Sequence, residues 1–298
     1  MAVSLPAGRF APSPTGLPHF GTLLAAVASF LHARHTGARW LLRIEDPDPD
    51  RAMPGAADAM LRTLEVLGLE WDGAPLYQSQ RTEAYRAALD QLKRQNHVFP
   101  CACSRREVAE AKHGVEGPVY PGTCRNGLAP GRSARSYRLR VNDLPITITD
   151  LVQGPVTQSL ARDVGDFVLL RGDGCFAYQL AVVVDDAFQH VTQVVRGADL
   201  LHSTPRQVFL QRQLGLPTPE YLHIPIVLDA TGKKLSKSEG APAVDPDHPA
   251  SLLYLALVVL GQQPAIELRE APPRELLRWA RQQWRADLIP RQKTFPPP

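Results

Sequence analysis

The sequence predicts an α/β protein with a doubly wound parallel sheet that is interrupted by an inserted subdomain. Three observations support this class. Strand-like and helical patterns alternate over residues 8–95, which is typical of parallel sheets covered by helices. The alternation stops near residue 101, where turns, prolines and basic residues follow, and it resumes near residue 166. The length of 298 residues is enough for two domains with a sizeable core.

Composition and charge are those of a soluble globular protein. The chain is 44% hydrophobic and 21% charged. No apolar run is long enough to cross a bilayer, and the N-terminus lacks the pattern of a signal peptide. We therefore expect a cytoplasmic protein with no membrane partner. The formal net charge of +3 neither requires nor excludes a nucleic acid.

A strand, a shaped loop and a helix follow one another near the N-terminus. A short buried strand is predicted over 8–11, a loop with three prolines and a glycine over 12–18, and a helix over 22–31. Such a loop lies at the carboxyl end of its strand, and the helix offers free N–H groups to an anion. His19 can hydrogen-bond a phosphate there, and Gly21 lets a nucleotide approach the backbone. The alternative is a proline-rich connection with an incidental histidine.

The alternation continues with a strand and two amphipathic helices, predicted over 40–45, 56–67 and 80–95. Glu45 closes the strand, so its carboxylate should reach the same crevice as the first loop. There it could receive a substrate ammonium group. A solvated acidic turn is the alternative, and it suits Asp48 and Asp50 better than Glu45.

The insertion brings three cysteines close together in the sequence: Cys101, Cys103 and Cys124. Thiolates are good zinc ligands in a reducing compartment, and a structural zinc site closes with four ligands. The fourth ligand here is not a cysteine. His113 and Tyr120 are the nearby candidates, of which histidine is the commoner ligand in general. Three unrelated buried thiols are the alternative.

The later elements follow from the same patterns. They are extended runs over 136–141 and 145–151, a strand over 166–171, an apolar run over 178–184, a strand over 190–196, a helix capped by Ser203 and ended by Gly215, helices over 249–260 and 273–284, and a frayed tail over 294–298. Arg196 stands at the carboxyl end of its strand. It should therefore point into the same crevice as Glu45.

A second phosphate-binding stretch is predicted far along the chain. The glycine-led loop over 232–238 carries three lysines and two serines, which could wrap a triphosphate. Alone, such a cluster is usually a solvated face. Paired with the first stretch, it resembles the HIGH and KMSKS signatures of class I aminoacyl-tRNA synthetases. They read here His19-Phe20-Gly21-Thr22 and Lys234-Leu235-Ser236-Lys237-Ser238. Thr22 replaces the second histidine of HIGH, and Leu235 replaces the methionine of KMSKS.

Four further motifs resemble the glutamyl- and glutaminyl-tRNA synthetase family. They are RFAPSPTG at 9–16, RIED at 43–46, AVVVDD at 181–186 and VRGAD at 195–199. Together with the lysine loop they cover nearly the whole chain in order. The cysteine insertion and the short tail resemble the short members of the family, which have no anticodon-binding domain.

This resemblance implies a division of the chain. It implies a Rossmann catalytic domain in two parts, 1–98 and 161–225, an inserted zinc-binding, acceptor-like α+β subdomain over 99–160, and the KMSKS loop with a short helical segment over 226–298. It also implies one structural zinc, held by Cys101, Cys103, Cys124 and a tyrosine shortly before the last cysteine. Tyr120 matches that place, so the resemblance favours it over His113.

The resemblance also implies which residues bind the substrates. Catalytic roles fall to His19, Lys234 and Lys237, and ATP binding to His19, Gly21 and Lys237. L-Glutamate binding falls to Arg9, Phe10, Ala11, Pro12, Ser13, Glu45, Tyr178 and Arg196. The chemistry agrees, because Glu45 suits an ammonium group, while Arg9 and Arg196 suit carboxylates.

We therefore expect an ATP-dependent glutamyl-tRNA-type ligase, with magnesium accompanying ATP. Roughly 60 residues follow Ser238, whereas an anticodon-binding domain would need about 100. By resemblance, the glutamyl group then passes from glutamyl-AMP to queuosine in the anticodon stem-loop of tRNA(Asp), on a monomeric enzyme. The alternatives are a truncated glutamyl-tRNA synthetase that charges the 3′ end of tRNA(Glu), a small-molecule nucleotidyltransferase, and a non-catalytic paralogue that binds RNA or amino acid.

Overall fold

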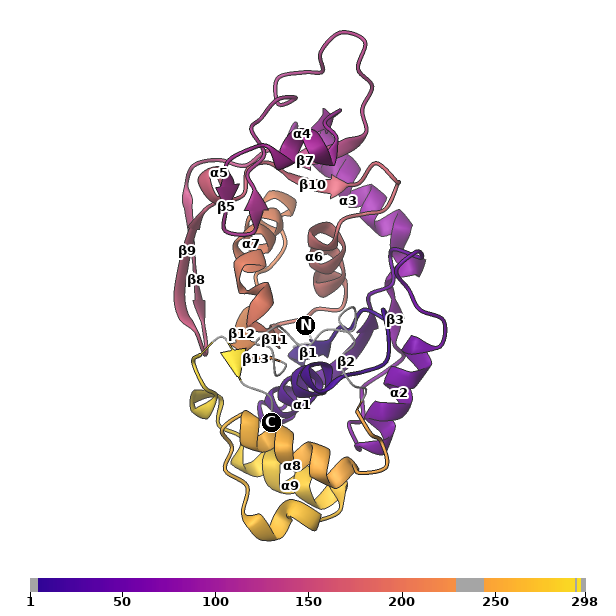
Figure 1. Cartoon of the computed structure of the whole chain (residues 1–298), viewed down its shortest axis with the longest axis vertical. Helices are drawn as coiled ribbons and strands as arrows, with labels where there is room; N and C mark the ends of the chain where they lie inside the picture. The colour runs from indigo at the N-terminus through magenta and orange to yellow at the C-terminus, as the bar shows by residue number, and fades with distance from the viewer. Residues whose placement is uncertain (1–4, 229–243, 293, 296–298) are drawn as a thin grey trace.

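Seven strands form the central sheet of the computed structural model, which describes residues 5–228, 244–292 and 294–295 (Figure 1). The strands are β1 (Ala7–Phe10), β2 (Arg39–Ile44), β3 (Leu76–Tyr77), β8 (Pro145–Asp150), β9 (Gly154–Ser159), β11 (Gln193–Gly197) and β12 (Glu220–Ile224). Their order is β3-β2-β1-β11-β12-β8-β9. Neighbouring strands are parallel except β8 and β9, which form a hairpin. The predicted α/β class with a mostly parallel sheet is confirmed.

Helices cover both faces of this sheet. They are α1 (Phe20–His35), α2 (Ala56–Val66), α3 (Thr82–Arg94), α6 (Tyr178–Phe188) and α7 (Thr204–Leu214). Successive residues of a strand point to opposite faces. Accordingly Val194 packs in the core shared by α3, α6 and α7, while Val195 packs in the core shared by α1 and α2. The sheet is therefore doubly wound, and α6 occupies the apolar run that begins at residue 178.

Helix α1 lies against the sheet under the first strand. Its middle turns are apolar on every side, so the helix can lie buried between the sheet and the C-terminal helices α8 (Pro249–Val259) and α9 (Pro273–Gln283). The helix begins at Phe20, two residues before the predicted start, since the side chain of His19 accepts a hydrogen bond from the N–H of Thr22 at 3.3 Å. Gly37 follows its end with φ of 72°, a left-handed conformation that suits glycine.

The cysteine region forms one end of the molecule, at the top of Figure 1. It contains a three-stranded antiparallel sheet, a short two-stranded ribbon and two short helices: β4 (Val98–Cys101), β7 (Ser136–Leu139), β10 (Phe167–Leu170), β5 (His113–Gly114), β6 (Gly117–Pro118), α4 (Arg105–Ala109) and α5 (Leu160–Asp163). The strand predicted over 166–171 exists, but the expectation that it resumes the parallel sheet is wrong. It pairs antiparallel with β7, because local pattern shows a strand and does not name its partner.

The hairpin of β8 and β9 belongs to the central sheet, although its sequence lies inside the predicted insertion. Asp150 at the end of β8 pairs with Tyr221 of β12, and β9 forms the outer edge. The chain therefore leaves the central sheet after α3 and returns to its far side. This crossing brings Asp150 toward the strand ends of the second half.

The C-terminal part packs against α1 at the opposite end, at the bottom of Figure 1. Its remaining elements are η4 (Ile266–Glu270), η5 (Ala286–Leu288) and β14 (Thr294–Phe295), which pairs with β13 (Ile226–Val227). Residues 294–295 are thus paired and not frayed, because β13 offers them a free edge. Within the described residues no helix is long and apolar enough to span a membrane.

Two short 3₁₀ helices, η1 (Gln78–Arg81) and η2 (Ala198–Ser203), precede α3 and α7. Ser203 immediately precedes α7 as predicted, but its hydroxyl does not cap that helix. It accepts hydrogen bonds from Arg206 at 2.9 Å and from Gln179 at 3.2 Å instead. These side-chain partners take the place of the capping bond that the local sequence suggested.

Candidate active site and metal centre

A cleft of about 870 Å³ lies at the carboxyl ends of β1, β2, β11 and β12. Its position follows from the sheet order, because the chain winds in opposite directions from β1 and β11 and leaves a crevice between them. Ten residues predicted to bind glutamate or ATP line this cleft: Arg9, Phe10, Ala11, Pro12, Ser13, His19, Gly21, Glu45, Tyr178 and Arg196. The predicted Lys234 and Lys237 lie outside the described residues.

Behind one wall of the cleft, buried charges alternate between two lining residues, Arg9 and Glu45, and two residues beneath them, Arg43 and Asp186. Arg9 on β1 contacts Asp186 of α6 through Nε at 3.1 Å, and Arg43 on β2 contacts the same carboxylate at 2.7 Å. Arg43 also reaches Glu45 at 3.5 Å and Gln189 at 3.0 Å. The contact of Arg9 uses Nε and not the two terminal nitrogens, which can form an end-on bidentate pair with a carboxylate.

Burial and ion pairing shift the pKa values of the carboxyl groups of Asp186 and Glu45 in opposite directions. Burial alone would raise the pKa of Asp186, but Arg9 and Arg43 hold that pKa below its ordinary value. Burial raises the pKa of Glu45, and the attraction of Arg43 and Arg9 offsets this rise only in part. Glu45 is therefore a buried carboxylate whose ionised form would gain from a further cation.

Asp185 anchors the helix that carries Asp186. Its carboxylate accepts hydrogen bonds from Tyr85 at 2.5 Å and Gln78 at 2.9 Å, and it pairs with Arg81 at 3.0 Å. The side chain of Asp185 is completely buried. The two adjacent aspartates thus fix α6 to α3 on one side and to the wall of the cleft on the other.

Arg196 on β11 occupies the other side of the cleft and is held at each of its nitrogens. Nε donates to His223 at 3.0 Å, Nη1 to the Tyr178 hydroxyl at 3.3 Å, and Nη2 to the Thr204 hydroxyl at 2.8 Å. His223 in turn contacts Asp150 at 2.6 Å. Burial lowers the pKa of His223 to about 4, so this imidazole is neutral near pH 7.

The N-terminus of α1 opens on the same cleft. His19 caps the helix, and Gly21 and Thr22 line the cleft beside it. A side chain at position 21 would place its first carbon 3.1 Å from the imidazole of His19. A larger residue at position 21 would therefore press on the imidazole ring, which glycine leaves undisturbed. The arrangement joins helix N–H groups with an imidazole, which together suit an anionic ligand.

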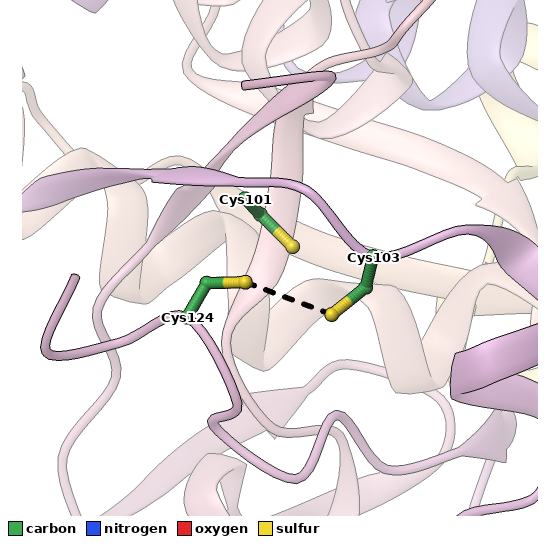
Figure 2. A group of neighbouring side chains, drawn as sticks. All are labelled: Cys101, Cys103 and Cys124. Carbon is green, nitrogen blue, oxygen red and sulfur yellow. Dashed lines mark hydrogen bonds between the residues drawn. The ribbon is translucent and has the colours of Figure 1, made fainter. Parts of the chain in front are cut away.

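Three sulfur atoms converge in the cysteine region. The side chains of Cys101, Cys103 and Cys124 point toward one another, and their sulfurs all lie within 4.8 Å (Figure 2). The Sγ atoms of Cys103 and Cys124 are 3.7 Å apart. Two sulfurs bound to one tetrahedral zinc ion at about 2.3 Å would be about 3.8 Å apart. The spacing therefore fits a shared metal ion and is too long for a disulfide.

Tyr120 lies at the same centre. Its hydroxyl oxygen is 3.4 Å from the Cys101 sulfur and 3.8 Å from the Cys103 sulfur. Burial raises the pKa of Cys101, but hydrogen bonds from Tyr120, from the backbone and from Arg138 lower it overall to about 7. His113 lies on the exposed β5 and is not part of the group. The cluster could hold a metal ion with sulfur ligands and a phenolic oxygen beside them.

Sequence reasoning did not assign roles to four buried side chains that lie behind the lining of the cleft and hold it in place: Arg43, Asp150, Asp186 and His223. Arg43 and Asp186 belong to motifs that indicated the family, so the sequence marked them as notable without assigning them a role. Asp150 ends a predicted extended run, and His223 lies in a strand. Their contacts join residues 73 positions apart, and only the fold brings such residues together.

The family model for the catalytic domain of class I tRNA synthetases (E and Q) matches residues 7–262. The chain belongs to this family of tRNA ligases, whose members use ATP, an amino acid and a tRNA. It is 55% identical over 284 residues to the glutamyl-Q tRNA(Asp) synthetase of Thiobacillus denitrificans, covering 95% of this chain and 94% of that protein. It is 54% identical over 286 residues to the protein of the same name from Aromatoleum aromaticum, covering 96% and 90%.

Solved structures support the fold. A glutamate tRNA ligase from Elizabethkingia meningosepticum, in complex with its amino acid, superposes with a TM-score of 0.80 at 24% identity. The match covers 97% of this chain and 66% of that ligase. A glutamate-tRNA synthetase from Elizabethkingia anophelis gives a TM-score of 0.81 at 24% identity, covering 97% and 67%.

Proposed function

We propose that this enzyme activates L-glutamate with ATP and transfers the glutamyl group to queuosine in the anticodon stem-loop of tRNA(Asp). The observation that carries the proposal is the charge pattern of the cleft. Four arginines and four carboxylates line the cleft, and three of these residues, Arg9, Arg196 and Glu45, lie on or directly after the central strands β1, β11 and β2. Glutamate carries two carboxylates and one ammonium group, so the pattern is complementary to it. The names of the relatives, matched over nearly their full length, support the acceptor.

Glu45 would receive the ammonium group of glutamate, which offsets the unfavourable burial of its own charge. Arg9 and Arg196 would hold the carboxylates, with Tyr178 and residues 10–13 completing the wall. Glutamine offers a neutral amide in place of the second carboxylate. It would leave a buried guanidinium without its counter-charge, which costs several kcal/mol in principle.

The first step would be attack of the glutamate α-carboxylate oxygen on the α-phosphorus of ATP. That bond forms as the bond to pyrophosphate breaks, and glutamyl-AMP results. No side-chain nucleophile is required, so the protein contributes positioning and charge stabilisation. His19, Lys234 and Lys237 would stabilise the phosphates beside Gly21, and magnesium would accompany ATP.

In the second step a hydroxyl group of the queuosine cyclopentene ring would attack the activated carbonyl. The ester bond forms, AMP leaves, and the hydroxyl proton is lost to solvent or to a phosphate oxygen. A ribose hydroxyl and a cyclopentenediol hydroxyl are similar nucleophiles, so the same adenylate could serve either acceptor. Unstacked bases of an anticodon loop are accessible to such a cleft.

The metal centre is proposed to hold one structural zinc ion through Cys101, Cys103, Cys124 and Tyr120. Four protein ligands would leave no open position for chemistry. The zinc would stabilise the subdomain around the cysteines. The expected bounds 99–160 also include the hairpin of β8 and β9, which belongs to the central sheet. The cysteines are not among the residues that line the cleft, so no catalytic step depends on them.

The test of this function is the choice of acceptor. Radiolabelled glutamate is offered with ATP and tRNA(Asp) that has queuosine, with tRNA(Asp) that lacks it, and with tRNA(Glu). We expect label only on the first, and the label should survive prior periodate oxidation of the 3′ diol when queuosine is added after oxidation. Labelling of tRNA(Glu) at its 3′ end would instead favour a truncated glutamyl-tRNA synthetase. Absence of any glutamate activation would favour a non-catalytic paralogue.

A further inference from the structure

A chain of three buried polar side chains runs from the hairpin to the cleft. Asp150 at the end of β8, His223 on β12 and Arg196 on β11 are exposed to 2%, 0% and 5%. Asp150 Oδ2 lies 2.6 Å from His223 Nδ1, and His223 Nε2 lies 3.0 Å from Arg196 Nε. Each link is short enough for a well-formed hydrogen bond.

The direction of each hydrogen bond follows from the donors available. An ionised carboxylate only accepts, so His223 must carry its proton on Nδ1 and donate it to Asp150. Burial raises the pKa of Asp150, but the hydrogen bond and attraction of His223, together with the backbone N–H groups, hold that pKa below its ordinary value. His223 Nε2 then offers a lone pair, which accepts the N–H of Arg196. Because Asp150 holds the ring proton on Nδ1, the neutral imidazole presents the lone pair of Nε2 as an acceptor for the guanidinium of Arg196.

The two oxygens of Asp150 have different partners. Oδ1 accepts three backbone N–H groups, from Val152 at 3.0 Å, Gln153 at 2.8 Å and His223 at 3.2 Å. Oδ2 faces the imidazole. These different partners fix the orientation of the carboxylate. They also determine the orientation of an amide group that replaces it.

We propose that Asp150 is a positioning residue for glutamate binding, acting through the tautomer of His223 to hold the guanidinium of Arg196 in the cleft. This inference rests on the proposed function, in which Arg196 binds a carboxylate of glutamate. Neither Asp150 nor His223 is among the residues that line the cleft, so both act through Arg196. The inserted stretch thereby contributes to amino-acid recognition as well as to the fold.

The variant Asp150→Asn tests the proposal with almost no change of shape. The amide oxygen must remain with the three backbone N–H groups, so the NH₂ group faces His223 Nδ1. Nδ1 then becomes an acceptor, and the ring proton moves to Nε2. That proton points at the N–H of Arg196, so Nε of the guanidinium loses its acceptor, while the Tyr178 and Thr204 hydroxyls still hold the two terminal nitrogens. A comparable isosteric change at a catalytic triad acts through the wrong histidine tautomer.

Two measurements separate positioning from a general structural role. First, ¹⁵N spectra of labelled histidine, assigned by loss of one signal in His223→Gln, should show the Nδ1–H tautomer in the wild type and the Nε2–H tautomer in Asp150→Asn. Second, ATP–pyrophosphate exchange should show the KM for glutamate raised about tenfold or more, as expected for the loss of a charged hydrogen bond. The KM for ATP should stay within about twofold.

The control is Asp166→Asn, which neutralises another buried aspartate. Asp166 pairs with Arg125 and accepts the N–H of Val141, and it is not among the residues that line the cleft. This variant should lower thermal stability and leave the KM for glutamate unchanged. An equal rise of KM in both variants would reduce Asp150 to a structural residue and overturn the proposal.

The outcomes also distinguish this inference from the proposed function. A wild-type enzyme that activates no glutamate would refute the proposed function, and the ¹⁵N spectra would still decide the tautomer. A wild type that activates glutamate, together with an Asp150→Asn variant of normal KM, would overturn the positioning role alone. A wild-type spectrum showing the Nε2–H tautomer would refute the proposal even if Asp150→Asn does not fold.

Discussion

The cleft and the cysteine cluster both gather reactive side chains, but they stabilise them differently. In the cleft each buried charge already has a partner of opposite sign or a matched hydrogen bond, as Asp186 has in Arg9 and Arg43. In the cluster three sulfurs converge, with Tyr120 and Arg138 as their nearest polar side chains. The first region is preorganised by the fold, whereas the second gathers thiols that could hold a metal ion.

This difference predicts opposite consequences of mutation. Removing a cleft side chain should impair substrate binding with little effect on folding, because the strand ends hold the remaining groups. Removing cysteines should impair folding with little effect on chemistry, because the metal would tie loops together. The predictions below test this contrast.

The largest effect is expected from Arg196→Ala. The variant removes a buried guanidinium that should pair with a substrate carboxylate, so the kcat/KM of ATP–pyrophosphate exchange with glutamate should fall roughly 100-fold or more. The midpoint of thermal unfolding should change by only a few degrees. Arg212→Ala removes an exposed arginine from α7 and should leave both quantities unchanged. Normal exchange in Arg196→Ala would mean that the cleft is not the glutamate site.

The cysteine cluster should show the reverse pattern. In Cys101→Ser with Cys124→Ser, the bound zinc measured by elemental analysis should fall from about one per chain to near zero. The unfolding midpoint should drop by roughly 5 °C or more. Exchange measured well below that midpoint should stay within about threefold of the wild type.

Cys175→Ser is the matched control, because Cys175 lies outside the cluster. It should retain both metal and stability. If the double variant kept its zinc, the cluster would not be the metal centre. If it lost exchange activity while remaining folded, the separation between the two regions would be wrong.

The smallest effect concerns acid stability. His32, buried on α1 beside Trp284, accepts a hydrogen bond from the indole N–H at 3.4 Å. Burial, aided by His35, lowers its pKa to about 4 from an ordinary value of 6.5. Between pH 6.5 and pH 4 the unfolded chain therefore binds more protons than the folded chain. The contribution of His32 to the free energy of unfolding is complete above pH 6.5 and is lost as the pH falls toward 4.

This group should account for about 2 kcal/mol of lost stability between pH 7 and pH 5. His223 has a similarly lowered pKa and should add to the loss. Chemical denaturation at the two pH values should show a smaller pH dependence in His32→Gln than in the wild type. His248→Gln removes an exposed histidine and should not alter it. An unchanged pH dependence in His32→Gln would show that His32 does not titrate as inferred.

Local pattern predicted the elements of the Rossmann part closely. The strand over 8–11 and the helices over 56–67 and 80–95 differ from the observed elements by one or two residues. The prediction succeeds for these segments because short-range periodicity in the sequence specifies the strands and helices of a parallel sheet. Residues at the carboxyl ends of such strands share one edge, so the meeting of Glu45 and Arg196 was predictable.

Strand partners and buried relays were not predictable in the same way. The sequence predicted that the run over 145–151 is part of the insertion, but this run pairs with β12 in the central sheet. The sequence predicted that the strand over 166–171 belongs to the central parallel sheet, but this strand pairs with β7. Both segments have ordinary strand patterns, and only long-range packing decides which edge each one meets. The roles of Asp150 and His223 depend on that choice.

The hairpin of β8 and β9 also changes what the sheet presents to other chains. An edge strand exposes unpaired N–H and C=O groups, which can recruit a strand from another molecule. Without the hairpin that edge would be β12, whose Tyr221, Leu222 and Ile224 are all buried. The edge is instead β9, where Pro155 offers no N–H and Thr157 is exposed. We therefore expect a shortened chain that lacks the hairpin to aggregate more readily than the full chain.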